Sequence, residues 1–290
     1  MSALERATQI ARTAQARVIL PELDDPRIVA VGDRLRREGL AVPVPLAERG
    51  DHHIEALMTS RPMRESIAAR MLERPLMRAA AMVASGEADI LVAGAIAPSR
   101  RVIEAVSIVI GLEEGTTTPS SFFLMVTADG REMIFADCAV NVDPDAAQLT
   151  DIAQVSQISA QRLLGAASVA LLSYSTGRSG IGVSVDKVAH AAELSGFPGP
   201  VQGDAALNRA VAAQKGSTGL GDANVLVFPN LDAGNIAYKL LVELAGARAY
   251  GPILQGFKRP VCDLSRGATV DDIVASTVLA IAADQMARSS

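Results

Sequence analysis

The sequence predicts an α/β fold in which helices cover both faces of mostly parallel central sheets. Short apolar runs alternate with longer stretches of helical periodicity, which is typical of parallel sheets with crossover helices. An Asp-Gly turn between two strand-like runs predicts an antiparallel hairpin, and therefore a mixed sheet in the second half. The chain has 290 residues, of which 49% are hydrophobic, enough for two domains at roughly 150 residues each.

The first half is predicted to alternate strands and helices. The run at 16–22 predicts a strand, after which Asp25 and Pro26 fit the N-cap and first residue of a helix that stops at Gly39. The next expected elements are a short strand at 40–46 that Pro43 and Pro45 weaken, a helix over about 62–85, a buried strand at 89–95, and a helix rather than a strand at 102–112.

A change of pattern at about residue 115 begins the second half. Two strand-like runs are joined by Ala128-Asp129-Gly130, which is a hairpin signal. Helices are then expected at about 146–164, at 184–195, from Asp204, from Asn230 to about Gly246, and at 270–287. Strands or extended segments are expected at 168–174, near 200–203, and at 224–229, 249–256 and 260–264.

No Pro- or Ser-rich linker and no repeat of fixed period separates the two halves. We therefore expect two domains in close contact. The first domain is expected to comprise 1–115 and 252–290, with the last helix returning to it, and the second to comprise 116–251.

Charge and aromatic content argue against a nucleic-acid partner. The chain carries 27 basic and 32 acidic residues, for a net charge of −5, so no excess of positive charge is available for phosphate backbones. Aromatic residues make up 3%, and Trp is absent, so base-stacking platforms are not expected.

Cysteine usage and the first residues point to a cytoplasmic protein. Cys138 and Cys262 are far apart and belong to no Cys/His cluster, so neither a disulfide framework nor a structural zinc site is expected. Charged residues interrupt the N-terminal stretch, which excludes a signal peptide, and no apolar run is long enough to cross a membrane.

The best-known nucleotide and hydrolase motifs are missing. No G-x-G-x-x-G follows a strand, and there is neither a P-loop nor a G-x-S-x-G elbow. A catalytic triad would need a histidine, and His190 lies in a helical run where a surface position is favoured.

Three loops after predicted strands combine small and polar residues, and ligands of open parallel sheets bind at such strand ends. The first loop spans 173–180. Its hydroxyls at Ser175 and Thr176, its glycines and the guanidinium of Arg178 suit a phosphate, although a solvent loop has the same composition.

The second loop spans 228–235. Asn230 or Asp232 could cap the following helix. Gly234 costs about 1 kcal/mol inside a helix and lies close to Asn235 and Asp232, which indicates a close approach to another segment or to a ligand.

The third loop spans 263–272. Ser265 and Arg266 lie just before a helix N-terminus, where free N–H groups favour an anion. Thr269 and Asp272 have capping-box spacing, so Asp272 could serve only to cap its own helix.

Taken together, these loops resemble those of the phosphate acetyltransferase and phosphate butyryltransferase family. The resemblance is strongest over 225–274 and extends through 201–207, 170–180, 119–125 and 135–141, with the opening strand and helix also similar. It implies a cytoplasmic homodimeric enzyme that moves an acetyl group reversibly between acetyl phosphate and coenzyme A. It also implies two α/β domains with the active site in the cleft between them, as in isocitrate and isopropylmalate dehydrogenases.

The resemblance also implies roles for individual residues. Asp272 matches the proposed general base for the coenzyme A thiol, Arg266 the arginine that holds the acyl phosphate, and Ser265 the serine near the phosphate or carbonyl oxygen. The residues expected to bind substrate are Ser120, Ser121, Ser175, Thr176, Arg178, Asn230, Asp232, Asn235 and Gln255. The expected reaction needs no metal, cofactor or covalent enzyme intermediate, because a carboxylate can take the thiol proton directly.

Departures from the family pattern occur at 97–101, at 113–115 and at Gly177-Arg178, and the segment after the early strands is short. These leave acyl-chain preference open, so a butyryl- or propionyl-transferring enzyme is the first alternative. A non-catalytic coenzyme A-sensing domain is the second. A decarboxylating dehydrogenase would need a carboxylate metal cluster that the sequence does not reveal.

Overall fold

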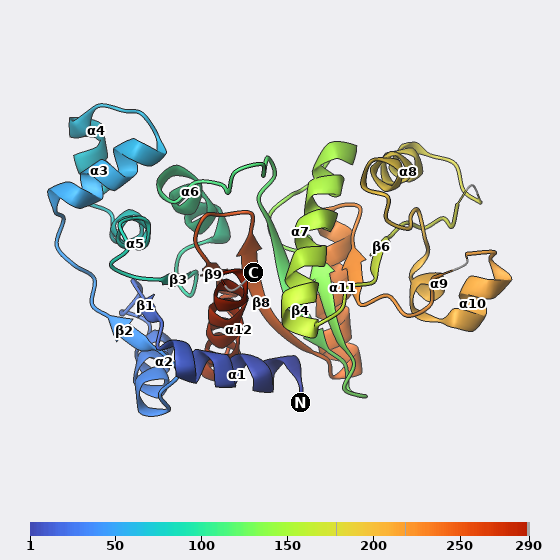
Figure 1. The fold of residues 1–290 in the computed structure, drawn as a ribbon, viewed down its shortest axis with the longest axis horizontal. Helices are drawn as coiled ribbons and strands as arrows, with labels where there is room; N and C mark the ends of the chain where they lie inside the picture. The colour runs from blue at the N-terminus through green and yellow to red at the C-terminus, as the bar shows by residue number, and fades with distance from the viewer. Residues whose placement is uncertain (178, 218, 289–290) are drawn as a thin grey trace. The chain divides into compact units, whose positions relative to one another are not determined.

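The computed structural model describes residues 1–177, 179–217 and 219–288. Their contacts divide the chain into two compact units (Figure 1). Unit 1 comprises Met1–Gly115 and Tyr250–Ser290, and unit 2 comprises Thr116–Ala249. The division into domains of 1–115 with 252–290 and of 116–251 stays a prediction.

Unit 1 contains a mixed sheet in the order β2-β1-β3-β9-β8. Its strands are β1 (Arg17–Ile19), β2 (Val42–Val44), β3 (Ile90–Ala93), β8 (Arg248–Gln255, whose first two residues fall in unit 2) and β9 (Val261–Asp263). Neighbouring strands from β2 to β9 are parallel, whereas β8 runs antiparallel to β9. Its helices are α1 (Ala3–Ala14), α2 (Pro26–Arg37), α3 (Asp51–Ser60), α4 (Glu65–Met71), α5 (Pro75–Ala84), α6 (Ser99–Val109) and α12 (Val270–Arg288).

The last helix forms much of the core of unit 1. Every residue of α12 from Ile273 to Ala282 is buried, as expected of a helix that is apolar on all sides. The first helix packs beside it (Figure 1), although the two lie at opposite ends of the sequence. The residues that α1 buries are Ala3, Ala7 and Ala11, and this stripe of small side chains lets the two helices approach closely.

Unit 2 contains a sheet in the order β4-β5-β7-β6. Its strands are β4 (Ser120–Val126), β5 (Glu132–Ala136), β6 (Val169–Leu171) and β7 (Val225–Val227). β4 and β5 form the expected antiparallel hairpin, while β5, β7 and β6 are parallel. Its helices are α7 (Ala146–Leu164), α8 (Val183–Ser195), α9 (Gly203–Leu207), α10 (Arg209–Gln214) and α11 (Leu231–Ala245).

Most expected elements are confirmed, including the N-cap at Asp25, the helix at 102–112 and the helix that Asn230 begins and Gly246 ends. The expected strand near 200–203 is wrong, because only a single bridge forms there, from Val201 to Leu172. Helices α1 and α3 were not among the expected elements.

Two expected helices are interrupted. The stretch at 62–85 forms two helices, because Pro75 cannot donate a hydrogen bond in an ongoing helix and instead starts α5. The helix expected from Asp204 is also split, because Asn208 caps a second helix by accepting bonds from the N–H groups of Ala210 and Val211.

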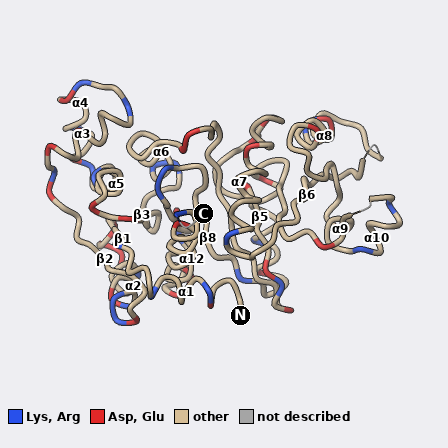
Figure 2. The backbone as a smooth tube through the Cα atoms, in the orientation of Figure 1, with Lys and Arg blue, Asp and Glu red and all other residues tan. Residues whose placement is uncertain are grey.

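No helix among the described residues is long and apolar enough to span a membrane. Basic and acidic residues are interspersed along the backbone of each unit (Figure 2).

Candidate active site

Parallel pairing brings three loops of unit 1 to one edge of its sheet. β1 pairs with β3, and β3 pairs with β9, all in the same direction. The segments that follow these strands therefore start at the same edge, where ligands of parallel sheets bind. These segments contain Glu22, the loop 94–97, and the Ser265–Arg266 loop.

The carboxylate of Glu22 accepts hydrogen bonds from the backbone of the loop that follows β3. Its Oε2 accepts the N–H groups of Gly94 at 2.7 Å and Ala95 at 2.8 Å. Its Oε1 accepts those of Ile96 at 3.2 Å and Ala97 at 2.6 Å. Four consecutive amides thus converge on a carboxylate of the chain itself, so they are not available to an external anion.

Arg27 anchors the Ser265–Arg266 loop from the first turn of α2. Its Nη1 donates to the carbonyl oxygens of Arg266 and Ala268, both at 2.8 Å. The carboxylate of Asp25 holds the same guanidinium at 2.6 Å, so the donor is fixed in place. The backbone of the loop is therefore tied to α2.

The side chains of Ser265 and Arg266 point to solvent from this anchored backbone. Both residues are exposed, and among the described residues no carboxylate pairs with the Arg266 guanidinium. A guanidinium without a partner beside a helix N-terminus is suited to an anion such as phosphate.

Asp272 makes the reciprocal capping contacts that its spacing predicts. Its Oδ2 accepts from the N–H of Thr269 at 3.0 Å and from the Thr269 hydroxyl at 2.7 Å. In return, the N–H of Asp272 donates to the Thr269 hydroxyl at 3.2 Å. Oδ1 accepts no hydrogen bond from any described residue, so one oxygen caps the helix and the other is unoccupied.

Asp263, at the end of β9, is a buried carboxyl group next to this loop. Its side chain is fully buried, and neither oxygen accepts a well-formed hydrogen bond from the described residues. Burial, with the nearby charge of Glu22, raises the pKa of Asp263 to about 6, while the Ser99 hydroxyl acts in the opposite direction. A Cβ at Gly94 would lie 2.7 Å from Oδ1 of Asp263, so the packing requires glycine there.

Unit 2 gathers its polar residues at the corresponding edge of its own sheet. β5 and β7 are parallel, whereas β4 is antiparallel to β5 and pairs Phe123 with Phe135. Continuing this register places Ser121 opposite Asp137. Ser121 and its neighbour Ser120 are both buried, and the Ser121 hydroxyl donates to Oδ1 of Asp137.

Asp137 organises the turn after β5. Its carboxylate accepts the N–H groups of Ala139 at 3.0 Å, Val140 at 3.2 Å and Asn141 at 2.7 Å. The side-chain amide of Asn141 donates to it as well, at 2.6 Å. The hydroxyl of Ser121 is thus part of a buried network rather than a free group.

The first turn of α11 packs against this network. Gly234 lies so close that a Cβ would be 2.6 Å from the carbonyl oxygen of Asp137, and Asn235 donates to the carbonyl oxygen of Cys138 at 3.1 Å. The close approach predicted at Gly234 is therefore to protein backbone. Asn230 caps α11 by accepting from the N–H of Ala233 at 2.9 Å, and Asp232 is exposed.

In the loop after β6, side-chain hydroxyls accept backbone hydrogen bonds and so hold the loop. Ser175 is buried and accepts the N–H of Gly180 at 2.7 Å. Thr176 accepts the N–H of Gln202 at 3.1 Å. Arg178, the predicted phosphate ligand of this loop, lies outside the described residues.

Gln255 lies away from the Ser265–Arg266 loop. It ends β8, which is antiparallel to β9 with Ile253 opposite Cys262. The end of β8 therefore lies at the start of β9, at the edge opposite to Arg266. Its side chain is buried, and the structure does not bring it to the Ser265–Arg266 loop.

Neither cysteine is suited to nucleophilic catalysis. Cys138 and Cys262 are buried, and burial raises the pKa of both thiols above the ordinary value. Only a thiolate is strongly nucleophilic.

Sequence reasoning missed three residues that position these loops: Glu22, Arg27 and Asp137. Each follows or lies close to a strand end, but each acts on a segment elsewhere in the chain. Asp25-Pro26 marked the helix that carries Arg27, yet nothing in the sequence links Arg27 to residue 266.

Comparisons with known proteins cover nearly the whole chain. A family model described as phosphate acetyl/butaryl transferase matches residues 47–281. A phosphate acetyltransferase of Acetivibrio thermocellus is 36% identical over 317 residues, which cover 94% of this chain and 96% of that protein. A phosphotransacetylase structure from Streptococcus pyogenes has a TM-score of 0.91 at 30% identity and covers 99% of this chain and 98% of the other.

Some similar proteins are longer. A phosphate acetyltransferase of Haemophilus influenzae is 35% identical over 94% of this chain, but the match covers 44% of that protein. The chain thus spans about half the length of such relatives.

We predict that replacing Asp263 by Asn stabilises the chain in a pH-dependent way. Between the ordinary pKa and about 6, the folded chain holds a proton that the unfolded chain releases, so stability falls as the pH rises through this range. The full loss in the free energy of unfolding is about 3 kcal/mol, and Asp263→Asn does not show it because an amide does not ionise. The Tm gain is therefore expected at pH 7.5 and not at pH 4. An equal gain at both pH values, or a gain in the exposed control Asp232→Asn, would contradict this explanation.

We also predict that Arg27→Met loosens the Ser265–Arg266 loop. Two bonds from a charged donor are lost, so amides at 265–269 should exchange with deuterium roughly tenfold to a hundredfold faster. Hydrogen-exchange mass spectrometry measures this, with the exposed Arg37→Met in the same helix as the control. Unchanged exchange in Arg27→Met would show that other contacts hold the loop.

Proposed function

The chain belongs to the phosphate acetyl/butaryl transferase family, and on this premise we propose that it transfers an acetyl group reversibly between acetyl phosphate and coenzyme A. The observation that carries the proposal is the exposed Ser265–Arg266 loop. It lies within the matched range, its backbone is anchored by Arg27, and its guanidinium has no carboxylate partner among the described residues.

The proposed reaction is direct attack by sulfur. The coenzyme A thiol loses its proton and bonds to the carbonyl carbon of acetyl phosphate, and the bond from that carbon to the phosphate oxygen breaks. A thiol of pKa about 8.5 is mostly protonated at neutral pH, so a positioned base accelerates the attack. Both reactants are substrates, and we propose no additional cofactor.

Asp272 is the proposed base. Its Oδ2 is held by Thr269, which fixes the orientation of the carboxylate, and Oδ1 is unoccupied by any described residue. Capping and proton transfer are therefore compatible, because they use different oxygens of one group.

Arg266 and Ser265 are the proposed phosphate-binding groups. Negative charge increases on the phosphate as it leaves, and the guanidinium at the N-terminus of α12 would stabilise that charge. The exposed Ser265 hydroxyl is placed to donate to a phosphate or carbonyl oxygen.

The polar edge of unit 2 is the proposed source of the remaining substrate contacts. Asp232 is exposed and Thr176 is partly exposed, so these two predicted residues are the more accessible ones. Ser175 is buried, Ser121 bonds to Asp137, and Asn235 supports the loop backbone. A cleft between two domains, as in isocitrate and isopropylmalate dehydrogenases, and a cytoplasmic location remain proposals from the family resemblance.

We propose that the protein is a homodimer that uses α11. This helix exposes Ile236, Leu240 and Leu244, which recur every four residues and so form an apolar stripe on one face. Such a stripe is costly to leave in water.

We predict that Leu240→Glu shifts the protein from dimer to monomer in multi-angle light scattering, because burying a carboxylate in an apolar interface is unfavourable. Lys239→Glu, at the adjacent exposed position, is the matched control. A monomeric parent protein, or a dimer unchanged by Leu240→Glu, would refute the interface.

A direct assay tests the function. The purified chain is mixed with coenzyme A and acetyl phosphate, and thioester absorbance is followed, with propionyl and butyryl phosphates in parallel. We expect the largest kcat/KM with acetyl phosphate. A preference for butyryl phosphate would identify the other activity in the family description, and no thioester with any substrate would favour a coenzyme A-binding domain without catalysis.

We predict that Asp272→Asn lowers kcat by roughly a hundredfold to ten-thousandfold because the base is lost. The amide oxygen of Asn can still accept from Thr269, so the Tm should change little. The matched control is Thr269→Ala, which removes the hydroxyl contacts of the cap but keeps the carboxylate and its bond from the N–H of residue 269. It should lower Tm, and it should lower kcat by less than Asp272→Asn does. A near-normal kcat in Asp272→Asn would leave the residue with a capping role alone.

A further inference from the structure

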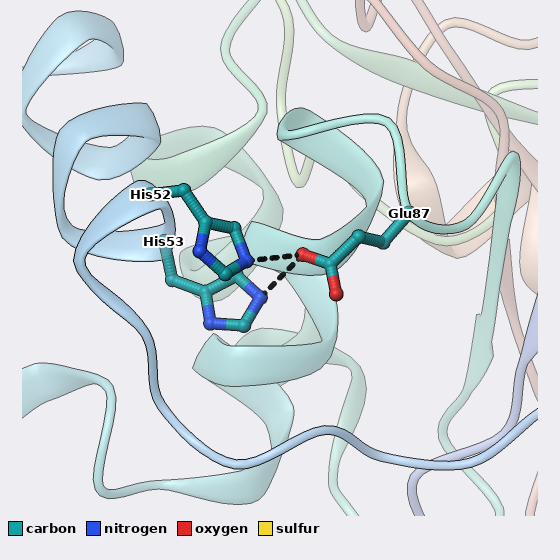
Figure 3. Close-up of side chains that lie close together, drawn as sticks. All are labelled: His52, His53 and Glu87. Carbon is teal, nitrogen blue, oxygen red and sulfur yellow. Dashed lines mark hydrogen bonds and ion pairs between the residues drawn. The ribbon is translucent and has the colours of Figure 1, made fainter.

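Two histidines and a glutamate of unit 1 lie close together at the end of β3 opposite to the loop 94–97. His52 and His53 lie in the first turn of α3, and Glu87 lies in the turn between α5 and β3 (Figure 3). Oε1 of Glu87 lies 2.7 Å from Nε2 of each histidine. One ligand atom from each residue lies within 4.8 Å of the others, and this is the one such cluster in the part of the chain that the structure describes.

We propose that His52, His53 and Glu87 form a binding site for Zn²⁺ or a similar divalent transition metal. Two imidazole nitrogens and one carboxylate oxygen make up a ligand set that zinc takes in proteins. With bonds of about 2.0–2.1 Å, tetrahedral ligands lie about 3.3 Å apart. The nitrogen-to-oxygen distances of 2.7 Å therefore need to open by only about half an ångström.

The three ligands differ in burial: one is enclosed by the protein, and two are accessible to solvent. The His53 side chain is fully buried, whereas the side chains of His52 and Glu87 are 56% and 36% exposed. The Ser85 hydroxyl donates to Oε1 of Glu87 at 3.0 Å and helps to orient it. A metal ion can thus enter from solvent and keep a water molecule as its fourth ligand.

Gly50 contacts both histidine rings. A Cβ at this position would lie 2.5 Å from the His52 ring, so a larger residue would displace that ring. The N–H of Gly50 donates to Nδ1 of His53 at 3.1 Å, which puts the proton of the neutral imidazole on Nε2, facing Glu87.

Metal binding therefore requires a proton shift. Nε2 of His53 must offer its lone pair to the metal, so the ring proton moves to Nδ1 and the bond from Gly50 breaks. Losing one such bond weakens binding by about tenfold, which is small compared with the affinity that zinc ligands provide together. Metal binding at this site therefore changes a hydrogen bond at the start of α3.

The location indicates a stabilising role. Glu87 precedes the first residue of β3, whereas the loop that Glu22 closes follows its last residue. The metal site and the candidate active site therefore lie at opposite ends of one strand. A bound metal would join α3 to the turn after α5, and we expect it to raise Tm without changing kcat.

Calorimetric titration of the EDTA-treated full chain with Zn²⁺ tests the proposal. We expect one ion per chain and a rise in Tm that EDTA reverses. His52→Asn and Glu87→Gln should each lower the affinity by about tenfold or more. His190→Asn is the matched control, because His190 is the remaining histidine and is exposed on α8.

Three results would overturn the proposal: no Zn²⁺ binding, binding that His52→Asn leaves unchanged, or binding that His190→Asn abolishes. Tm without metal shows that each variant is folded, and His52 is exposed enough for its replacement to be tolerated. The nitrogen chemical shifts of His53 supply an independent readout, since metal binding should move its proton from Nε2 to Nδ1.

Discussion

Parallel pairing of β1, β3 and β9 is the constraint on which the candidate active site of unit 1 depends. It brings the segments after three strands to one edge of the sheet, although they are separated by up to about 240 positions in sequence. The alternation of strands and helices is what makes this pairing possible, because a parallel strand needs a crossover to return. Once the strand ends meet, two charged side chains hold the loops. Glu22 collects the amides of 94–97, and Arg27 ties down the carbonyl groups of 266 and 268.

In each unit, a carboxylate of the chain satisfies the backbone amides of a loop at a strand end. Loops at strand ends carry backbone amides with no partner in a sheet or helix, and leaving such groups buried without a bond is costly. In unit 1 the carboxylate of Glu22 satisfies four of them, and in unit 2 Asp137 satisfies three. Because these anion-binding turns are filled by carboxylates of the chain itself, an external phosphate must be held elsewhere. Within the Ser265–Arg266 loop, the Arg266 side chain, which no described carboxylate neutralises, fits this requirement.

Asp272 illustrates how a capping residue can also be a candidate base. Its spacing from Thr269 is that of a capping box, and the contacts confirm that interpretation. The same contacts use one carboxylate oxygen and fix the direction of the other. Positioning of this kind reduces the conformational freedom that a base would otherwise lose when it reacts. A structural role and a chemical role are therefore not alternatives at this residue.

Local patterns in the sequence determined most of the fold. Asp25, Pro26 and Gly39 bounded α2, the Asp-Gly turn specified the hairpin, and Asn230 and Gly246 bounded α11, because capping and turn preferences depend on neighbouring residues alone. The loop of Ser265 and Arg266 was also found in this way. Tertiary structure decided four other contacts. It pairs Glu22 with residues 94–97 and Arg27 with residue 266. It also packs Gly234 against Asp137 and brings His52 and His53 to Glu87. Each joins segments at least 34 positions apart, and such contacts leave no periodicity or spacing in the sequence, because only the folded sheet brings their partners together.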